Sequence, residues 1–288
     1  MLTHDQVEEY RREGFLFVPN CYSPEEVQLI KQRMRTDLRP QDEQVVYEKD
    51  STTVRSVYGV HAAEGLFDTL SRHFKLAQSA QALLDGPTYV YQSKLNVKAA
   101  FDGDVWDWHQ DYVYWLNEDG MPSSQVLTAA LFLDDITEFN GPLTVVPRSH
   151  KKGVLGCHVH DGKPEGYEER PEWIGNLTAH LRYTVERNTV SDLALSNGLV
   201  APKGPAGSVL FFDGNLVHAS QGNISPFPRS VLLYTYNRVD NAPRPEALHR
   251  PHFLASRDVR PIDIAATDLS QHLNGRTAAS VQGLASTP

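Results

Sequence analysis

The second half of the chain is a succession of short segments rich in β-branched and aromatic residues, and this pattern restricts the fold most strongly. Glycine, proline, asparagine and aspartate separate the segments, as is typical of consecutive strands. The segments are TYVYQSKLNVKAAF, QVLTAALFLDD, PLTVVP, GSVLFFDG and RSVLLYTYNRV. QVLTAALFLDD is apolar almost throughout, which indicates a strand buried on both faces. We therefore expect a mainly β chain, a sandwich or a barrel.

Helices are expected to precede and flank these strands. In THDQVEEYRREG, Thr3 followed by Gln6 has the pattern of a capping box at the start of a helix. SPEEVQLIKQRMRTDL repeats this pattern with Ser23 and Glu26, and it places a proline at the first helical position. Residues 62–84 indicate one or two further helices.

We predict that residues 1–288 form a single domain. Residues 1–86 are expected to be its mostly helical part, and residues 87–245 its β core. Residues 155–200 interrupt this core with a polar, irregular stretch, which is more typical of a lid or binding loop. Residues 265–288 are rich in serine, alanine and glycine, a composition typical of disorder.

Charge and composition exclude several classes of partner and location. The net charge of -9 argues against a protein that binds nucleic acid or an anionic membrane. Two cysteines are too few for a disulfide framework, and they fit a reducing compartment. The N-terminus lacks the apolar core of a signal peptide, and no apolar run is long enough to span a membrane. We expect a cytoplasmic protein with a small-molecule substrate; its oligomeric state stays open, with a homodimer as one arrangement.

The segment DWHQDYVYWLNEDGMP contains the first candidate metal ligands, His109 and Asp111. The segment looks like a strand, in which residues i and i+2 point to the same face. An imidazole nitrogen and a carboxylate oxygen can then converge on one divalent metal ion. Two ligands are too few for tight binding, so a half-exposed strand with polar residues facing water is the alternative.

A second segment, FFDGNLVHASQGNISPFPRS, contains the residue types that are still missing. His218 follows a predicted strand and loop, and Arg229 opens the next strand. A guanidinium pairs bidentately with a carboxylate, so Arg229 suits a dicarboxylate cosubstrate, and the Ser220 hydroxyl could assist. Two histidines and one carboxylate form the facial triad of non-haem Fe(II) oxygenases, which leaves positions open for cosubstrate and O₂.

These motifs resemble the phytanoyl-CoA dioxygenase superfamily of Fe(II)/2-oxoglutarate-dependent dioxygenases, and most closely its ectoine hydroxylase branch. The matching stretches are YQSKLNVKAAF, WHQDYVYWLNEDGMP, FNGPLTVVPRSH, FFDGNLVHASQGNISPFPRS and YNRVDNAPRP. The EDGMP and NGPLTVVPRSH blocks are much more specific than the isolated ligand motif. The resemblance implies one dioxygenase domain with a double-stranded β-helix, a cupin-like jelly roll, and the metal at its mouth.

Residue roles follow from the resemblance by position. It implies that His109, Asp111 and His218 bind Fe(II). It also implies that Arg229 binds the distal carboxylate of 2-oxoglutarate, with help from Ser220. The remaining matched positions are Asn96 and Thr128 for the cosubstrate, and Gln92, Trp115 and Tyr112 for the substrate.

The resemblance implies hydroxylation of a small polar metabolite, an amino acid or an ectoine-like derivative in a biosynthetic pathway, with release of succinate and CO₂. The alternative keeps Fe(II), 2-oxoglutarate and O₂ but gives desaturation, epimerisation or cyclisation of a natural-product intermediate. A non-catalytic binding module and a zinc hydrolase are further alternatives. The complete ligand set argues against the first, and Arg229 against the second.

This chain departs from the ectoine hydroxylase pattern beside the metal ligands, at positions that bear on the substrate and leave the iron ligands in place. Ectoine hydroxylases usually read WHSDFETWH where this chain reads WHQDYVYWL. The changed positions are Gln110, Tyr112, Val113, Tyr114 and Leu116. Because a glutamate and a threonine beside the metal are replaced, the polarity that would position a substrate differs here.

Overall fold

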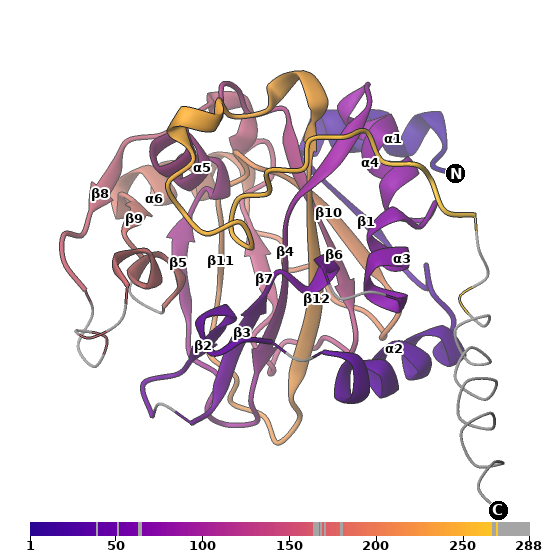
Figure 1. Cartoon of the computed structure of the whole chain (residues 1–288). Coiled ribbons are helices and arrows are strands. Elements are labelled where there is room, and N and C mark those ends of the chain that lie inside the picture. The colour runs from indigo at the N-terminus through magenta and orange to yellow at the C-terminus, as the bar shows by residue number, and fades with distance from the viewer. Residues whose placement is uncertain are drawn as a thin grey trace, which may run out of the picture.

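In the computed structural model, two antiparallel β-sheets face each other, and helices cover the outer face of the larger sheet (Figure 1). The structure describes residues 1–38, 40–50, 52–62, 65–163, 167, 169, 171–178, 181–266 and 269. This is the double-stranded β-helix that the family resemblance implied, with the flanking helices that the sequence pattern predicted.

The larger sheet has seven strands in the order β1-β10-β6-β12-β4-β3-β2. Their bounds are β1 (Phe15–Val18), β2 (Val45–Tyr47), β3 (Val54–Tyr58), β4 (Thr88–Lys98), β6 (Val126–Phe132), β10 (Val209–Asp213) and β12 (Arg229–Arg238). The smaller sheet has the order β5-β11-β7. It consists of β5 (Trp106–His109), β7 (Leu143–Val145) and β11 (His218–Ser220).

Six α-helices are present in the described part of the chain: α1 (His4–Glu13), α2 (Pro24–Asp37), α3 (Leu66–Arg72), α4 (Ala77–Leu84), α5 (Asp111–Asp119) and α6 (Arg187–Asn197). Both predicted capping boxes are confirmed, at Thr3 and at Ser23. Short 3-10 helices are η1 (Asp42–Gln44), η2 (Val60–Ala62), η3 (Ser149–Lys152), η4 (Glu172–Leu177), η5 (Val239–Asn241) and η6 (Pro245–Ala247). Among the described helices, none combines the length and apolar character that a membrane crossing requires.

Strand β6 is buried on both faces, as its apolar sequence predicted. Leu127, Ala129 and Leu131 belong to the core beneath the helices. Ala130 and Phe132 belong to the core between the two sheets. Since neighbouring residues of a strand point to opposite faces, β6 supports the helical layer and also lines the interior.

The N-terminal part also contains strands that the sequence analysis missed. β1 pairs with β10 at one edge of the larger sheet, and β3 pairs with β4 and with β2 toward the other edge. The chain enters β1 directly from α1, because Gly14 ends the helix in the left-handed region at φ 84. Strands this short show too few repeats for a clear hydrophobic period.

Regular structure is present in residues 155–200, which were expected to be irregular. The described residues include the paired strands β8 (Cys157–Val159) and β9 (Tyr183–Val185), followed by α6. β9 lies beside β5 of the smaller sheet. The predicted disorder of residues 265–288 falls outside the described residues, except at 265, 266 and 269.

Candidate active site

The segment with the first two candidate ligands is a strand followed by a helix. β5 ends at His109, and Asp111 is the first residue of α5, so the prediction of one continuous strand was wrong. Gln110 lies between them in an extended conformation, with φ -120 and ψ 127, as the N-cap residue. The helix dipole favours a carboxylate such as Asp111 in the first turn.

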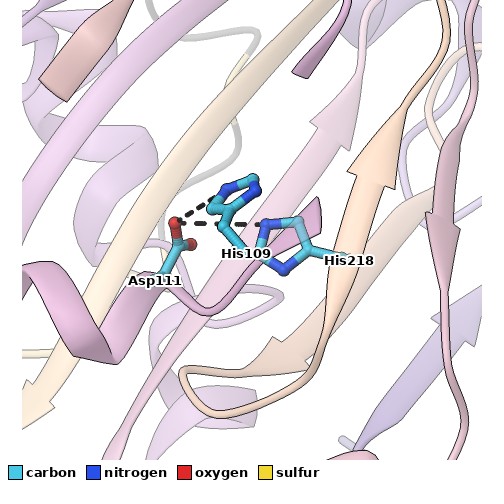
Figure 2. Close-up of side chains that lie close together, drawn as sticks. All are labelled: His109, Asp111 and His218. Carbon is cyan, nitrogen blue, oxygen red and sulfur yellow. Dashed lines mark ion pairs between the residues drawn. The ribbon is translucent and has the colours of Figure 1, made fainter. Parts of the chain in front are cut away.

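The third candidate ligand faces the first one across the smaller sheet. β11 pairs antiparallel with β5 so that His218 is the direct partner of His109. Asp111 Oδ1 lies 3.6 Å from His109 Nε2 and 4.0 Å from His218 Nε2 (Figure 2). One potential ligand atom from each residue lies within 4.8 Å of the others. The structure thus brings the three side chains to one point.

Backbone carbonyl groups orient both imidazoles. Nδ1 of His109 lies 2.6 Å from the carbonyl oxygen of Asp107, and Nδ1 of His218 lies 2.9 Å from that of Leu216. Because a carbonyl oxygen only accepts hydrogen bonds, each Nδ1 carries the proton and each Nε2 presents a lone pair. This is how a metal-binding histidine is usually held.

The protonation states also fit a metal centre. Burial and, to a lesser extent, nearby His109 together lower the pKa of His218 from 6.5 to about 4. Burial would raise the pKa of Asp111, but its interactions with His109 and His218 outweigh burial and hold it below the usual range. Two neutral imidazoles and one carboxylate are the donor set that suits non-haem Fe(II).

A cavity adjoins the three side chains between the sheets. Its polar lining consists of His109, Asp111, His218, Lys94, Asn96, Ser220 and Arg229. Its apolar lining consists of Trp106, Ala130, Phe132, Ile136, Leu143, Leu210, Phe212, Val231 and Leu233. Mostly apolar walls with a few converging polar groups are characteristic of a small-molecule site.

Arg229 gives this cavity a buried positive charge. The side chain is at the start of β12, its residue is 5% exposed, and it forms no ion pair with the described residues. Its Nε, and Oδ1 of Asn96, have no hydrogen-bond partner in the described part of the chain. Burial lowers the pKa of Arg229 to about 10, and nearby Arg55 adds to this effect, yet the group remains cationic at neutral pH. A buried cation is costly unless an anion pairs with it, so the cavity is suited to an anion.

Comparison with known proteins agrees with this geometry. The sequence matches the phytanoyl-CoA dioxygenase (PhyH) family over residues 10–231. The chain belongs to the phytanoyl-CoA dioxygenase family.

Relatives of this dioxygenase include a proline hydroxylase and ectoine dioxygenases. It is 40% identical over 253 residues to L-proline trans-4-hydroxylase from Streptomyces griseoviridis, which covers 88% of this chain and 92% of the relative. It is 39% identical over 269 residues to the ectoine dioxygenase of Stutzerimonas stutzeri, covering 90% of this chain and 85% of the relative. The predicted resemblance to the ectoine hydroxylase branch is thereby confirmed.

A solved structure supports the fold of the dioxygenase. EctD from S. alaskensis with 2-oxoglutarate and 5-hydroxyectoine matches with a TM-score of 0.77 and 29% sequence identity, over 93% of this chain and 89% of that chain. EctD has also been solved with bound Fe, and that structure matches with a TM-score of 0.76 and 29% identity, over the same shares of the two chains.

Of the predicted cosubstrate residues in the dioxygenase, Asn96, Ser220 and Arg229 line the cavity with the three candidate ligands. Thr128 lies on the inward face of β6, and its Oγ1 is 3.0 Å from Oγ1 of Thr235 on β12. This contact already uses hydrogen-bonding capacity of the Thr128 hydroxyl. Its contact with the cosubstrate stays a prediction.

The predicted substrate residues of the dioxygenase lie in a neighbouring buried region. Gln92 donates from Nε2 to the carbonyl oxygen of Leu254 at 2.7 Å. The Tyr112 hydroxyl donates to the carbonyl oxygen of Met121 at 3.1 Å. Trp115 belongs to the same aromatic cluster as Tyr112. Their contact with the substrate stays a prediction.

Lys94 is a cavity residue that the sequence analysis of this dioxygenase overlooked. It lies on β4 with Asn96, and both side chains line the cavity. Its Nζ lies 5.7 Å from the centre of the Trp106 ring, and no ion pair joins it to a described carboxylate. The two-residue repeat of a strand could have revealed it, because Gln92, Lys94 and Asn96 are two residues apart and therefore share one face of β4.

Proposed function

We propose that this protein is an Fe(II)- and 2-oxoglutarate-dependent dioxygenase that hydroxylates a small polar metabolite. One observation carries the proposal: Arg229, which is buried and forms no ion pair with the described residues, shares a cavity with the converging side chains of His109, Asp111 and His218. The triad suits Fe(II), and the guanidinium suits the distal carboxylate of 2-oxoglutarate. The hydroxylases among its relatives support the same assignment.

The residues of the chain divide the work of binding. His109, Asp111 and His218 would hold the metal from one side, and Arg229 would fix the far end of 2-oxoglutarate. When bound, Fe(II) supplies the activation of O₂, which is coupled to decarboxylation of 2-oxoglutarate to succinate and CO₂. The apolar walls exclude water, so the charged groups interact strongly and a reactive species is protected from side reactions.

Lys94 supports a substrate that carries a carboxylate. The charges of Fe(II), Asp111, 2-oxoglutarate and Arg229 cancel when all are bound. Lys94 therefore leaves one positive charge in the cavity, beside the metal-binding side chains. We infer that the substrate is an amino acid or a cyclic amino-acid derivative, whose carboxylate Lys94 would bind.

Residues 155–200 are proposed to act as the lid of this site. The hydroxyl of Tyr114 on α5 donates to the carbonyl oxygen of Tyr183 on β9 at 3.1 Å, so a hydrogen bond joins residues 155–200 to the helix that begins at Asp111.

We also propose a cytoplasmic location. Cys21 and Cys157 are free thiols, which fits a reducing compartment.

The proposal is tested by succinate formation from 2-oxoglutarate with Fe(II), with L-proline and ectoine as the first substrates. The wild type should form succinate in step with a product that is heavier by one oxygen atom. Loss of two hydrogen atoms would instead establish the desaturation alternative. Asp111→Ala should abolish substrate-dependent succinate, whereas Asp5→Ala, at an exposed position in α1, should not. Substrate-dependent activity in Asp111→Ala would contradict the site assignment.

A further inference from the structure

Gln110, the residue between two of the candidate ligands, uses all the hydrogen-bonding groups of its side-chain amide. Its Nε2 donates to the carbonyl oxygen of Asn215 at 2.6 Å and to that of Gly153 at 2.9 Å. Its Oε1 accepts from the backbone N–H of Leu155 at 2.9 Å. The residue is 2% exposed, so these protein groups are its partners in place of water. A primary amide fits this set of two acceptors and one donor.

The partners of Gln110 belong to two separate segments that adjoin the metal-binding side chains. Asn215 precedes Leu216, whose carbonyl oxygen orients the imidazole of His218. Gly153 lies just before the proposed lid, and Leu155 is its first residue. One buried side chain thus ties the His109–Asp111 segment to the loop of the third ligand and to the lid.

We propose that Gln110 is a positioning residue, which sets the placement of the His109–Asp111 segment relative to the His218 loop. The proposal rests on the proposed function, because it takes these three side chains as the metal ligands. Groups that hold metal ligands in place are typically worth about 10–100-fold in metal affinity. We expect loss of the Gln110 contacts to weaken metal binding by a factor in this range.

The chemistry of the side chain defines a sharp variant. Gln110→Glu keeps the shape but cannot donate to the two carbonyl oxygens of Asn215 and Gly153, so buried acceptors would face each other. Gln110→Ser adds no charge, and its hydroxyl is too short to reach both segments. Serine is also the residue usual at this position in the ectoine hydroxylase pattern, so those enzymes would need another way to join the segments.

A matched control is available at Asn140, which is another buried amide that bridges backbone groups. Its Nδ2 donates to the carbonyl oxygen of Asp135 at 2.8 Å, and its Oδ1 accepts from the N–H of Thr137 at 2.9 Å. Asn140→Asp makes the same change of amide to carboxylate in the loop between β6 and β7. It contacts neither of the segments that Gln110 joins.

The experiment is a Mn(II) titration of the metal-free full chain. The electron paramagnetic resonance signal of free Mn(II) decreases as the ion binds, and this decrease measures the affinity. Thermal unfolding without metal is measured in parallel. Gln110→Glu and Gln110→Ser should bind Mn(II) about 10–100-fold more weakly than the wild type. Asn140→Asp should bind it with unchanged affinity even if it unfolds at a lower temperature. Wild-type affinity in the Gln110 variants, or an equal loss in Asn140→Asp, would overturn the proposal.

Hydrogen exchange of the wild type decides the question if the variants do not fold. Coupling between two sites is reciprocal, so contacts that strengthen metal binding are themselves strengthened by the metal. Exchange of the Leu155 amide hydrogen should slow when Mn(II) is added, and unchanged exchange would overturn the proposal. Absence of Mn(II) binding to the wild type would refute the proposed function as well, whereas binding that is independent of Gln110 refutes the positioning role alone.

Discussion

His109 and His218 are direct partners across the antiparallel pair of β5 and β11, and their ring centres lie 4.1 Å apart. The register of two short strands therefore places the two imidazoles together. A slip of one residue would turn one ring to the opposite face of the sheet. The site depends on this pairing as much as on the identity of the residues.

Replacing Arg229 should weaken 2-oxoglutarate binding. Truncating one partner of a buried charge pair typically costs about 2–5 kcal/mol, so KM for 2-oxoglutarate in Arg229→Met should rise by roughly 30-fold or more. Arg229→Lys should recover only part of this loss, because lysine lacks the bidentate fork. Steady-state kinetics at saturating Fe(II) measure both effects. An unchanged KM would show that another residue binds the distal carboxylate.

Replacing Lys94 should affect the substrate and spare the cosubstrate. A hydrogen bond to a charged group contributes about 1.5–3 kcal/mol, so KM for the accepted amino acid in Lys94→Met should rise on the order of 10-fold or more. Lys94→Arg keeps the charge and serves as the control, with a smaller rise. KM for 2-oxoglutarate should stay within a factor of about two. A rise in that constant alone would assign Lys94 to the cosubstrate instead.

The ion pair between Arg250 and Asp119 should stabilise the helix that begins at Asp111. Asp119, the last residue of α5, is fully buried and accepts from Arg250 Nε at 2.9 Å and from the hydroxyl of Tyr91. Removing one member of a buried pair costs about 3–5 kcal/mol, so Arg250→Met should lower the free energy of unfolding by that amount. Urea denaturation measures it.

The double variant Asp119→Asn with Arg250→Met is the control for this pair. It leaves no uncompensated buried charge, so it should lose less stability than the sum of the two single variants. Additive losses would show that the two side chains are energetically independent.

The stability of the protein should decrease in acid partly through His61. Burial lowers the pKa of His61 from 6.5 to about 4, and the charge of Asp68 opposes this only in part. The unfolded chain then binds a proton more readily than the folded one, so stability falls as pH drops from about 6.5 and levels off below about 4.

The variant His61→Gln isolates this contribution because its side chain does not titrate. In the folded protein, Nδ1 of His61 lies 2.6 Å from Oγ of Ser93, a contact that the glutamine amide can replace. Between pH 7 and pH 4.5, the variant should lose on the order of 1–2 kcal/mol less unfolding free energy than the wild type. Equal losses in urea denaturation would show that His61 titrates normally.

The residues of the site could be predicted from the sequence, whereas the secondary structure around them was predicted only in part. His109, Asp111, His218 and Arg229 were identified from their chemistry and family motifs, and the structure brings all four to one cavity. The strand expected at Asp111 is a helix instead, because α5 begins directly where β5 ends. The spacing of apolar residues cannot locate the boundary between a strand and a helix when aromatic residues occur on both sides of that boundary.

The roles of Lys94 and Gln110 could not be predicted from the sequence, because they depend on contacts between residues far apart in the chain. Lys94 looks like any lysine on a strand, and its significance comes from folding, which places it in the cavity beside Asp111 without an ion pair to a described carboxylate. The role of Gln110 likewise depends on Asn215 and Gly153, which lie far away along the chain. Whether a buried polar side chain has hydrogen-bond or ion-pair partners is decided only when the interior is packed.

By itself, the sequence determined the first two helices, the strands β4, β6, β7, β10 and β12, and the donor atoms available for Fe(II), because periodicity and side-chain chemistry are local properties. Only the tertiary structure decided that these donors meet, that Arg229 is buried without an ion pair to the described residues, and that Gln110 joins two segments. The reason is physical: strand register and burial arise from contacts between distant residues, and these contacts exist only in the folded chain.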